Sequence, residues 1–556
     1  MNTSRALRGL AITTACGLVV AGCAPLGAPK DGVEHELSNE ARANQARTVS
    51  ERFAKKPEVL QDPDGSGLDA VNKIFEKSET AVISGPHPAD QLRAASVAAV
   101  AHAPMIVLQE GNGPAVRDTL EKLKVNTVLT IGQHATFDFG SRKVVVDRGH
   151  ADSLEKLTSL KFAEVRTDEP VKSLVDLNTK QPALFVQPTI AQPEPRAGQG
   201  EQEGNFPLQS QQDGGSAPIV LVSPESSLAS VATAKAYGAE LRYTPYGDPR
   251  VNDDTMEAVA GMANEPMLAL GRQFGTSERF RERIIRGEQI TQQQPGGGGL
   301  VFPGRRIVAL YGHPSGPALG VMGEQPPAEA AAKAQELAKQ YQPHSQEPVV
   351  PAFEIIATVA SGSPGADGDY SNEADPAELI PYIDAITAAG GYAVLDLQPG
   401  RANLLDQAKR YEELLKRPNV GLALDPEWKI GPNEKPMERV GSVEAREIDE
   451  VSAWLAGLVR DNKLPQKPLV LHQFQLQMIR DRETLNLDYD ELAFVLHADG
   501  HGSTGDKYGT WDVMRQGLDP RFFMAWKNFI DEDKPMFSPE RTMNEVNPKP
   551  WFVSYQ

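Results

Sequence analysis

Cysteine is almost absent from this sequence: its 556 residues include two, Cys16 and Cys23. Both lie near the N-terminus, so no disulfide framework can hold the body of the chain together, and stability must come from ordinary apolar cores. Basic residues are also in deficit, with 56 Lys and Arg against 75 Asp and Glu and a formal net charge of −19. This balance argues against binding to nucleic acid, and against charge-driven binding to anionic lipid.

Long hydrophobic runs are missing too. The longest apolar stretch extends from Leu10 to about Val20, behind Arg5 and Arg8, and is shorter than the ~20 residues of a membrane-spanning helix. This pattern predicts an export signal rather than a transmembrane segment. The nucleotide-binding patterns GxGxxG and GxxxxGK[ST] are not found behind any predicted strand, which argues against a phosphate-binding loop.

The end of this export signal, Val20-Ala21-Gly22-Cys23, resembles the lipobox of bacterial lipoproteins. The resemblance implies cleavage before Cys23, acylation of that cysteine, and a mature chain anchored by lipid on the extracytoplasmic face of the cell membrane.

Breaks in composition divide the chain into five parts. The predicted parts are a signal peptide at 1–22, a flexible tether at 23–64, an α/β module at 65–290 with a disordered insertion at 191–217, a glycine-rich linker at 291–304, and a larger domain at 305–556.

The α/β module contains two similar units. Each has a buried strand, an Ala-rich helix, a second strand, a helix and a third strand ending in Gly. The first unit spans 46 positions from Pro86 to Gly132 and the second spans 47 from Pro224 to Gly271, which predicts duplicated Rossmann-like units with parallel strands.

The first unit, with Gly67-Leu68-Asp69, Ala89-Asp90, Ala103–Leu108 and Thr130-Ile131-Gly132, resembles the type-two cell-wall-binding repeats of Gram-positive surface proteins. The resemblance implies attachment to a wall polymer. A plain α/β scaffold without wall affinity is the alternative.

Beyond residue 305 the pattern becomes strand, loop, helix. Eight strand candidates alternate with helical stretches over about 250 residues, which predicts a (β/α)8 barrel, with an open doubly wound sheet as the alternative. The candidates are 306–313, 349–361, 391–400, 419–428, 468–475, 491–502, 522–528 and 551–556.

Polar residues follow several of these apolar strands at positions i and i+2, which share one face of a strand. Because barrel chemistry sits at the C-terminal strand ends, we expect these side chains to gather at one mouth. They are Asp396 and Gln398, Asp425 and Glu427, His497 and Asp499, with His313 and His472 at two further strand ends.

The Asp-x-Glu segment at 425–427 resembles the catalytic segment of barrel-type glycoside hydrolases of the chitinase-like and wall-lysozyme-like kinds. The resemblance implies that Glu427 is the general acid, with Asp425 orienting the reacting group. Two such carboxyls on one face repel each other, so one pKa should rise. We add Asp396 to the catalytic set and expect Trp428 to stack on a sugar ring. The remaining expected substrate contacts are Gln398, His313, His472, His497 and Asp499.

Two other interpretations stay open. His497, Asp499 and His501 could bind a metal ion with Asp396, Asp425 or His472, as in a metal-dependent hydrolase. The barrel could instead bind glycan or protein without catalysis, through Trp428, Trp511 and Tyr508.

The favoured prediction is an exported envelope lipoprotein that binds the cell wall and carries a glycosidase-like barrel without cofactor or metal. Its expected partners are cell-wall glycan or polymer and, through the lipid anchor, the membrane, with no nucleic acid.

Overall fold

The computed structural model describes residues 38–132, 137–192, 205–208 and 216–556. The predicted signal peptide and Cys23 lie outside these residues, as does most of the predicted insertion at 191–217. Of that insertion, Phe206 is described, and its side chain is buried in the core of the α/β module. Within the described part of the chain, no helix combines the length and the apolar character needed to span a membrane.

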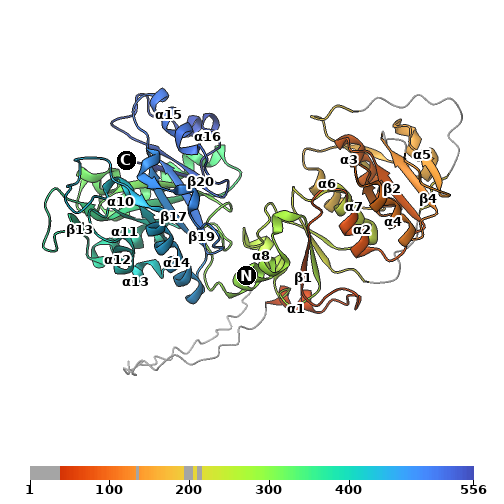
Figure 1. Ribbon diagram of the computed structural model, residues 1–556, viewed down its shortest axis with the longest axis horizontal. Helices are drawn as coiled ribbons and strands as arrows, with labels where there is room; N and C mark the ends of the chain where they lie inside the picture. The colour runs from red at the N-terminus through yellow and green to blue at the C-terminus, as the bar shows by residue number, and fades with distance from the viewer. Residues whose placement is uncertain (1–37, 133–136, 193–204, 209–215) are drawn as a thin grey trace, which may run out of the picture. The chain divides into compact units, whose positions relative to one another are not determined.

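The C-terminal domain is a closed barrel of eight parallel strands, which confirms that prediction (Figure 1). The first strand pairs with the second on one side and with the eighth on the other, so an open sheet is excluded. The short strand β13 (Ser371–Glu373) is added antiparallel to β12. In spatial order the barrel strands are β11 (Arg306–Gly312), β12 (Val349–Ala360), β14 (Tyr392–Leu397), β15 (Val420–Leu424), β17 (Lys467–Gln473), β19 (Leu492–Ala498), β20 (Phe523–Asn528) and β21 (Phe552–Tyr555).

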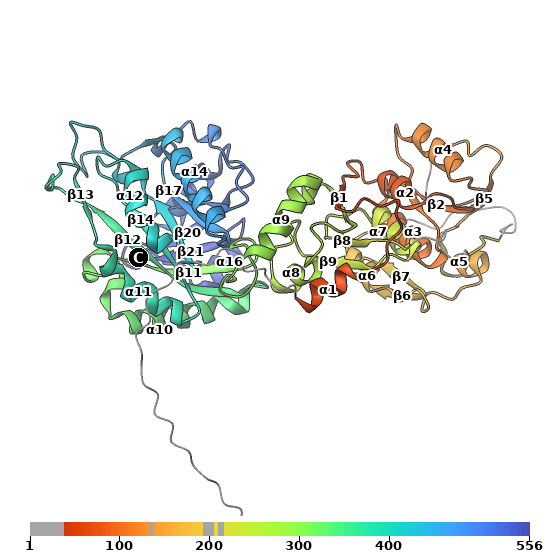
Figure 2. The same ribbon diagram turned by 90° about the horizontal axis from the view of Figure 1, so that it is seen from below.

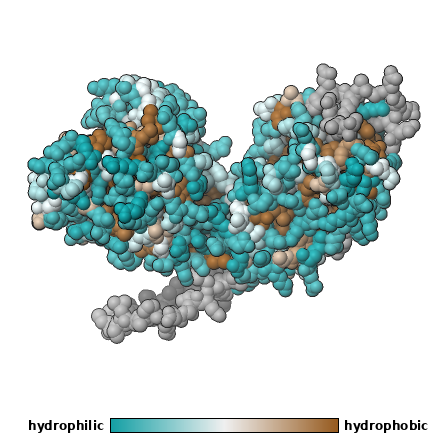
Figure 3. Space-filling model, viewed as in Figure 1, coloured by the Kyte–Doolittle hydropathy of each residue, from teal (hydrophilic) through white to brown (hydrophobic). Residues whose placement is uncertain are grey.

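Helices cover the outside of the barrel, as Figure 2 shows for α10, α11, α12 and α14. The strands are apolar on both faces because one face packs on these helices and the other fills the interior. On the face of the molecule shown in Figure 3, hydrophobic residues lie scattered among hydrophilic ones. The helices are α10 (Pro327–Tyr341), α11 (Pro376–Ala388), α12 (Leu404–Arg410), α13 (Glu412–Leu415), α14 (Ala445–Asp461), α15 (Thr504–Arg515) and α16 (Pro539–Glu545).

The barrel interior has two layers of different polarity. Side chains alternate between the two faces of each strand, so residues two apart point the same way. The lower layer is an apolar cluster drawn from all eight strands: Ile307, Ala309, Val350, Ala352, Tyr392, Val394, Ala423, Val470, Ala493, Val495, Ala525 and Phe552. Two positions beyond the lower layer, the inward-facing residue of each strand is polar, or, for β15, the residue that follows the strand. These residues are Tyr311, Glu354, Asp396, Asp425, His472, His497, Lys527 and Ser554.

The segment predicted as a linker, 291–304, is packed against the base of the barrel. Val301 and Phe302 join the apolar lower layer, and the Phe302 ring lies 5.3 Å from that of Phe523. Arg305, fully buried, donates hydrogen bonds to the carbonyls of Pro295, Gly297, Leu300 and Val301. The glycine-rich segment therefore closes the N-terminal end of the barrel.

The α/β module contains two four-stranded parallel sheets with matching strand order. In each sheet the first strand of the predicted unit lies between the second and third, and one further strand pairs with the third. The helices α3 (Pro88–Ala101) and α7 (Leu228–Tyr237) pack against each other. The first sheet has the order β3 (Met105–Val107), β2 (Thr80–Ser84), β4 (Thr127–Ile131), β5 (Lys143–Val146), and the second β9 (Leu241–Tyr243), β8 (Ile219–Val222), β10 (Met267–Leu270), β1 (Pro57–Leu60). The remaining elements are α2 (Leu68–Ile74), α4 (Gly113–Lys122), α5 (Ala151–Thr158), β6 (Ala163–Arg166), α6 (Pro170–Asp176), β7 (Ala183–Val186), α8 (Asp253–Val259) and α9 (Ser277–Gln289).

Residues 38–64, expected within a flexible tether, are folded. They form helix α1 (Asn39–Gln45) and strand β1, and β1 extends the second sheet by pairing with β10. The sequence signal was weak because this strand has four residues and only alternate positions are buried.

Lys467, the first residue of β17, offers a stability prediction because its ammonium group is fully buried. Nζ donates hydrogen bonds to the carbonyls of Arg417 and Val420, and burial lowers the pKa of Lys467 to about 7. An unfolded lysine titrates near roughly 10.4, so between these values the unfolded state holds more protons and stability should rise with pH. Relative to Lys467→Met, the free energy of unfolding of the wild type should increase by up to about 1.4 kcal/mol per pH unit from pH ~7 to ~10.

Below pH ~7 the difference between the two proteins should stay constant, because the lysine is protonated in both states. Urea unfolding at several pH values measures the difference, in which other titrations largely cancel. Parallel stability profiles for wild type and variant would show that Lys467 keeps its ordinary pKa.

Candidate active site

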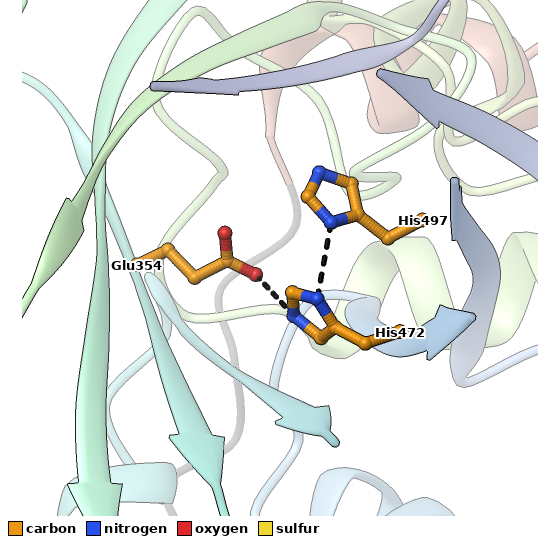
Figure 4. Close-up of side chains that lie close together, drawn as sticks. All are labelled: Glu354, His472 and His497. Atoms are coloured by element: carbon orange, nitrogen blue, oxygen red, sulfur yellow. Dashed lines mark hydrogen bonds and ion pairs between the residues drawn. The ribbon is translucent and has the colours of Figure 1, made fainter. Parts of the chain in front are cut away.

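The polar layer of the barrel is organised around His472, which is fully buried between carboxylates. Its Nε2 lies 2.9 Å from Oε1 of Glu354 (Figure 4) and 3.9 Å from Oδ1 of Asp396. Its Nδ1 lies 2.6 Å from Oδ2 of Asp499. Burial alone would lower the pKa of His472, but Asp499, Glu354 and Asp396 outweigh burial and raise it well above its usual value.

His497 lies beside His472 and differs in charge. Its Nδ1 is 3.2 Å from Nδ1 of His472 and 2.6 Å from Oδ1 of Asp499, and its Nε2 is 3.1 Å from the hydroxyl of Ser554. Burial lowers the pKa of His497, so near neutral pH this imidazole is uncharged. Figure 4 shows that His472 contacts both Glu354 and His497.

Two further groups complete the polar layer. Tyr311 donates a hydrogen bond to Oδ2 of Asp396 at 2.8 Å and accepts one from Gln398 at 3.3 Å. Lys527 lies with Nζ 3.7 Å from Oδ2 of Asp499 and 4.0 Å from the centre of the Tyr311 ring. Burial would raise the pKa of Asp499, but His472 and Lys527 hold it well below its usual value.

A cavity of about 540 Å³ opens above this layer at the C-terminal ends of the strands. Its wall combines carboxyl groups with flat apolar side chains, a combination typical of small-molecule binding sites. The lining includes Tyr311, Gln398, Asp425, Glu427, Trp428, Phe474, Asp499, Lys527 and Phe529.

The two acids of the 425–427 segment both have raised pKa values. Burial, followed by the charge of Asp396, raises the pKa of Asp425 well above its ordinary value. Burial, followed by the charge of Asp499, raises the pKa of the half-buried Glu427. A carboxyl that keeps its proton at higher pH can donate it to a substrate oxygen.

The local geometry of these acids differs from the sequence-based expectation. We expected Asp425 and Glu427 on one face of a strand, but β15 ends at Leu424 and residues Pro426–Trp428 form a short 3₁₀ helix. Asp425 caps this helix by accepting a hydrogen bond from the Glu427 backbone N–H at 3.2 Å. Pro426 has no N–H for the strand ladder, so the strand stops before it. Both acids nevertheless line the cavity.

The other predicted site residues divide into two groups. Asp396, His472 and His497 belong to the buried polar layer, while Gln398, Trp428 and Asp499 line the cavity. His313 is not among the lining residues: it lies in a turn after β11, where its Nδ1 is 2.8 Å from the Ser315 hydroxyl.

Of the aromatic residues invoked for a binding surface, Trp511 is buried and donates to the carbonyl of Asn547. Tyr508 packs on Trp526 and Phe537. Neither ring lines the cavity, so the expectation that both rings belong to a binding surface at the mouth was wrong.

Glu354, Lys527, Tyr311 and Ser554 were not predicted as site residues. Each stands inside or at the end of an apolar strand rather than in a polar turn. The alternation of inward and outward side chains along a strand could have identified them. Each lies two positions after an apolar residue of the lower layer, namely Ala352, Ala525, Ala309 and Phe552 respectively.

Two groups among the described residues have the donor types and spacing of a metal site. Glu354, His472 and His497 offer ligand atoms within 4.8 Å of one another and are buried, whereas Asp367, Asp369 and Glu373 form a more exposed group after β12. His501, expected as a ligand with His497, packs on Phe529 at 5.4 Å and belongs to neither group.

The fold and the cavity together define a TIM-barrel-like domain with an acidic, aromatic-lined mouth. Comparison with known proteins gave no match to any family model and none to the curated proteins.

Proposed function

We propose that this chain is an exported cell-envelope lipoprotein whose barrel is a glycoside hydrolase acting on envelope glycan. The observation that carries the proposal is Glu427, a carboxyl with a raised pKa on the wall of the cavity, beside Trp428. A glycosidase needs one protonated carboxyl and one ionised carboxylate facing the same substrate. Environments that move two pKa values apart provide that pair.

In this proposal Glu427 donates its proton to the glycosidic oxygen as the bond to the leaving sugar breaks. Asp499, whose pKa is held low, is the ionised carboxylate on the same cavity wall and stabilises the positive charge that develops on the sugar ring. After burial, the charges of Asp499 and Asp396 raise the pKa of Glu427, and Trp428 offers an apolar face to a sugar ring.

The direct test is digestion of purified envelope glycan by the full chain, followed as new reducing ends. Appearance of reducing ends supports the hydrolase. Binding of glycan in the cavity without any cleavage would favour the non-catalytic alternative, because the same carboxyls and Trp428 would then serve recognition alone.

The lipoprotein part of the proposal rests on the lipobox-like Val20–Cys23 segment. Replacing Cys23 by Ala should move the protein from the membrane fraction to the soluble fraction, because the acyl anchor is lost. Immunoblotting of the fractions measures this, and a variant that stays in the membrane fraction contradicts lipid anchoring.

The repeat module at 65–290 is proposed to bind a wall polymer, on the resemblance of its first unit and the matching strand orders of its two sheets. The released Cys23→Ala chain provides the test. It should sediment with purified walls, and less so in high salt; a chain that stays in the supernatant would leave the module a scaffold.

A further inference from the structure

Beneath the cavity, some buried carboxylate oxygens have no hydrogen-bond donor. Oε2 of Glu354 and Oδ1 of Asp396 are buried and accept no hydrogen bond among the described residues. A buried oxygen without a donor loses its hydration and gains nothing in exchange. Both residues flank Nε2 of His472, which lies 2.9 Å from Oε1 of Glu354 and 3.9 Å from Oδ1 of Asp396.

We infer that Glu354, Asp396 and His472 form a binding site for one divalent transition-metal ion in the buried polar layer beneath the cavity. One imidazole nitrogen with carboxylate oxygens is a donor set that suits zinc and similar ions. The inference does not depend on the proposed hydrolase activity.

The separations from Nε2 of His472 are close to those around such an ion, whereas Asp396 lies outside the group whose ligand atoms are all within 4.8 Å of one another and must move toward Glu354. Ligand atoms about 2.0–2.2 Å from zinc, at angles of 90–110°, lie roughly 2.9–3.5 Å apart. The 2.9 Å separation falls in this range, and the 3.9 Å separation requires Asp396 to approach. His497 also lies within ligand distance, but its Nδ1 faces Asp499 and its Nε2 faces Ser554. Oε1 of Glu354 and the free Oδ1 of Asp396 flank Nε2 of His472, whereas His497 faces the opposite ring nitrogen, Nδ1.

The outer contacts of these ligands are those that a metal site uses. A metal-bound histidine normally gives its other N–H to a carboxylate, which fixes the ring. Nδ1 of His472 faces Asp499 at 2.6 Å in this way. Tyr311 donates to the second oxygen of Asp396 at 2.8 Å and so leaves Oδ1 turned toward His472.

Charge also favours a divalent ion. Glu354, Asp396 and Asp499 carry three negative charges when ionised, and Lys527 supplies one positive charge beside Asp499. A divalent ion at a neutral His472 balances the remaining two charges. In the competing arrangement no metal binds, and a proton on Nε2 of His472 takes the position of the ion. The experiment below distinguishes the metal-bound from the protonated arrangement.

The test is zinc binding by the full chain after removal of metal with a chelator. Calorimetric titration should find about one zinc per chain, and cobalt in place of zinc should give a visible d–d absorption band. Glu354→Gln and Asp396→Asn keep side-chain shape but remove one ligand charge each, and should each weaken zinc binding by at least ~10-fold. The matched control is Glu336→Gln, on the exposed surface of α10 and in neither candidate metal group, which should leave this stoichiometry and affinity unchanged.

Folded wild-type protein that takes up no zinc overturns the inference, as do Glu354→Gln and Asp396→Asn variants with wild-type affinity. If a variant does not fold, the melting temperature of the wild type decides: it should rise with zinc concentration, as for any ligand that binds the native state, and a constant value contradicts the site. These measurements use no glycan. A metal-loaded chain that cleaves nothing therefore contradicts only the hydrolase, and an active chain that takes up no zinc contradicts only the metal site.

Discussion

The Glu427→Gln variant is expected to lose glycan turnover by about 10²–10⁴-fold, the usual contribution of a general acid. The amide keeps the shape of the side chain but has no acidic proton to give to the leaving oxygen. Burial and the nearby Asp499 raise the pKa of Glu427, so wild-type activity should fall as pH rises through this raised pKa, above the ordinary range of a glutamate. Initial rates of reducing-end release, followed for both proteins over a pH series, measure the loss of turnover and the pH dependence in one experiment.

Binding provides the internal check on this variant. Glycan affinity should change little, because Trp428 and the other cavity residues are untouched. Glu532→Gln is the matched control: it makes the same substitution at an exposed position at the cavity rim and should keep the wild-type rate and pH profile. If Glu427→Gln turns over glycan at the wild-type rate, the proton comes from another group.

Arg305→Met should destabilise the barrel by about 3–5 kcal/mol, the range found when a buried charged group and its partners are separated. The guanidinium holds four backbone carbonyls of the segment that closes the barrel base. Burial lowers the pKa of Arg305 to about 10, so it remains charged at neutral pH. Methionine fills similar space but donates nothing, and the four carbonyls would then be buried without partners.

Urea unfolding measures this loss. Arg521→Met is the control, because Arg521 is exposed and pairs with Asp519 on the surface, where such pairs contribute about 0–1 kcal/mol. A loss below ~1 kcal/mol for Arg305→Met would mean that the 291–304 segment is held by its apolar contacts and its hydrogen bonds to Gln466.

The barrel was predictable from sequence because its strands are apolar on both faces and alternate with helices. Asp396, Asp425, His472 and His497 were found for the same reason: each interrupts an apolar strand near its end. Glu354 was missed because Ile355, Ile356 and Ala357 continue the strand after it, so no strand end marked it. Lys527 was missed because its strand was the hardest to recognise. Counting two positions along each strand from the apolar lower layer would have identified both Glu354 and Lys527.

Two local geometries could not be predicted from alternation. His313 would point inward if β11 continued, but the strand ends at Gly312 and the chain turns between His313 and Gly316. Glu427 reaches the cavity through a turn of 3₁₀ helix rather than along a strand. In both places the strand ends before the polar residue assigned to it, at Gly312 rather than residue 313 and at Leu424 rather than residue 428, and side-chain direction beyond that point depends on the turn.

The apolar lower layer, sealed by Val301 and Phe302, makes the interior of the barrel a dead end rather than a tunnel. Whatever reaches Glu427 must enter and leave by the same opening, so a long polymer cannot be threaded through the domain. A polymer can be engaged only by a terminus, a side branch or a segment lying across the rim.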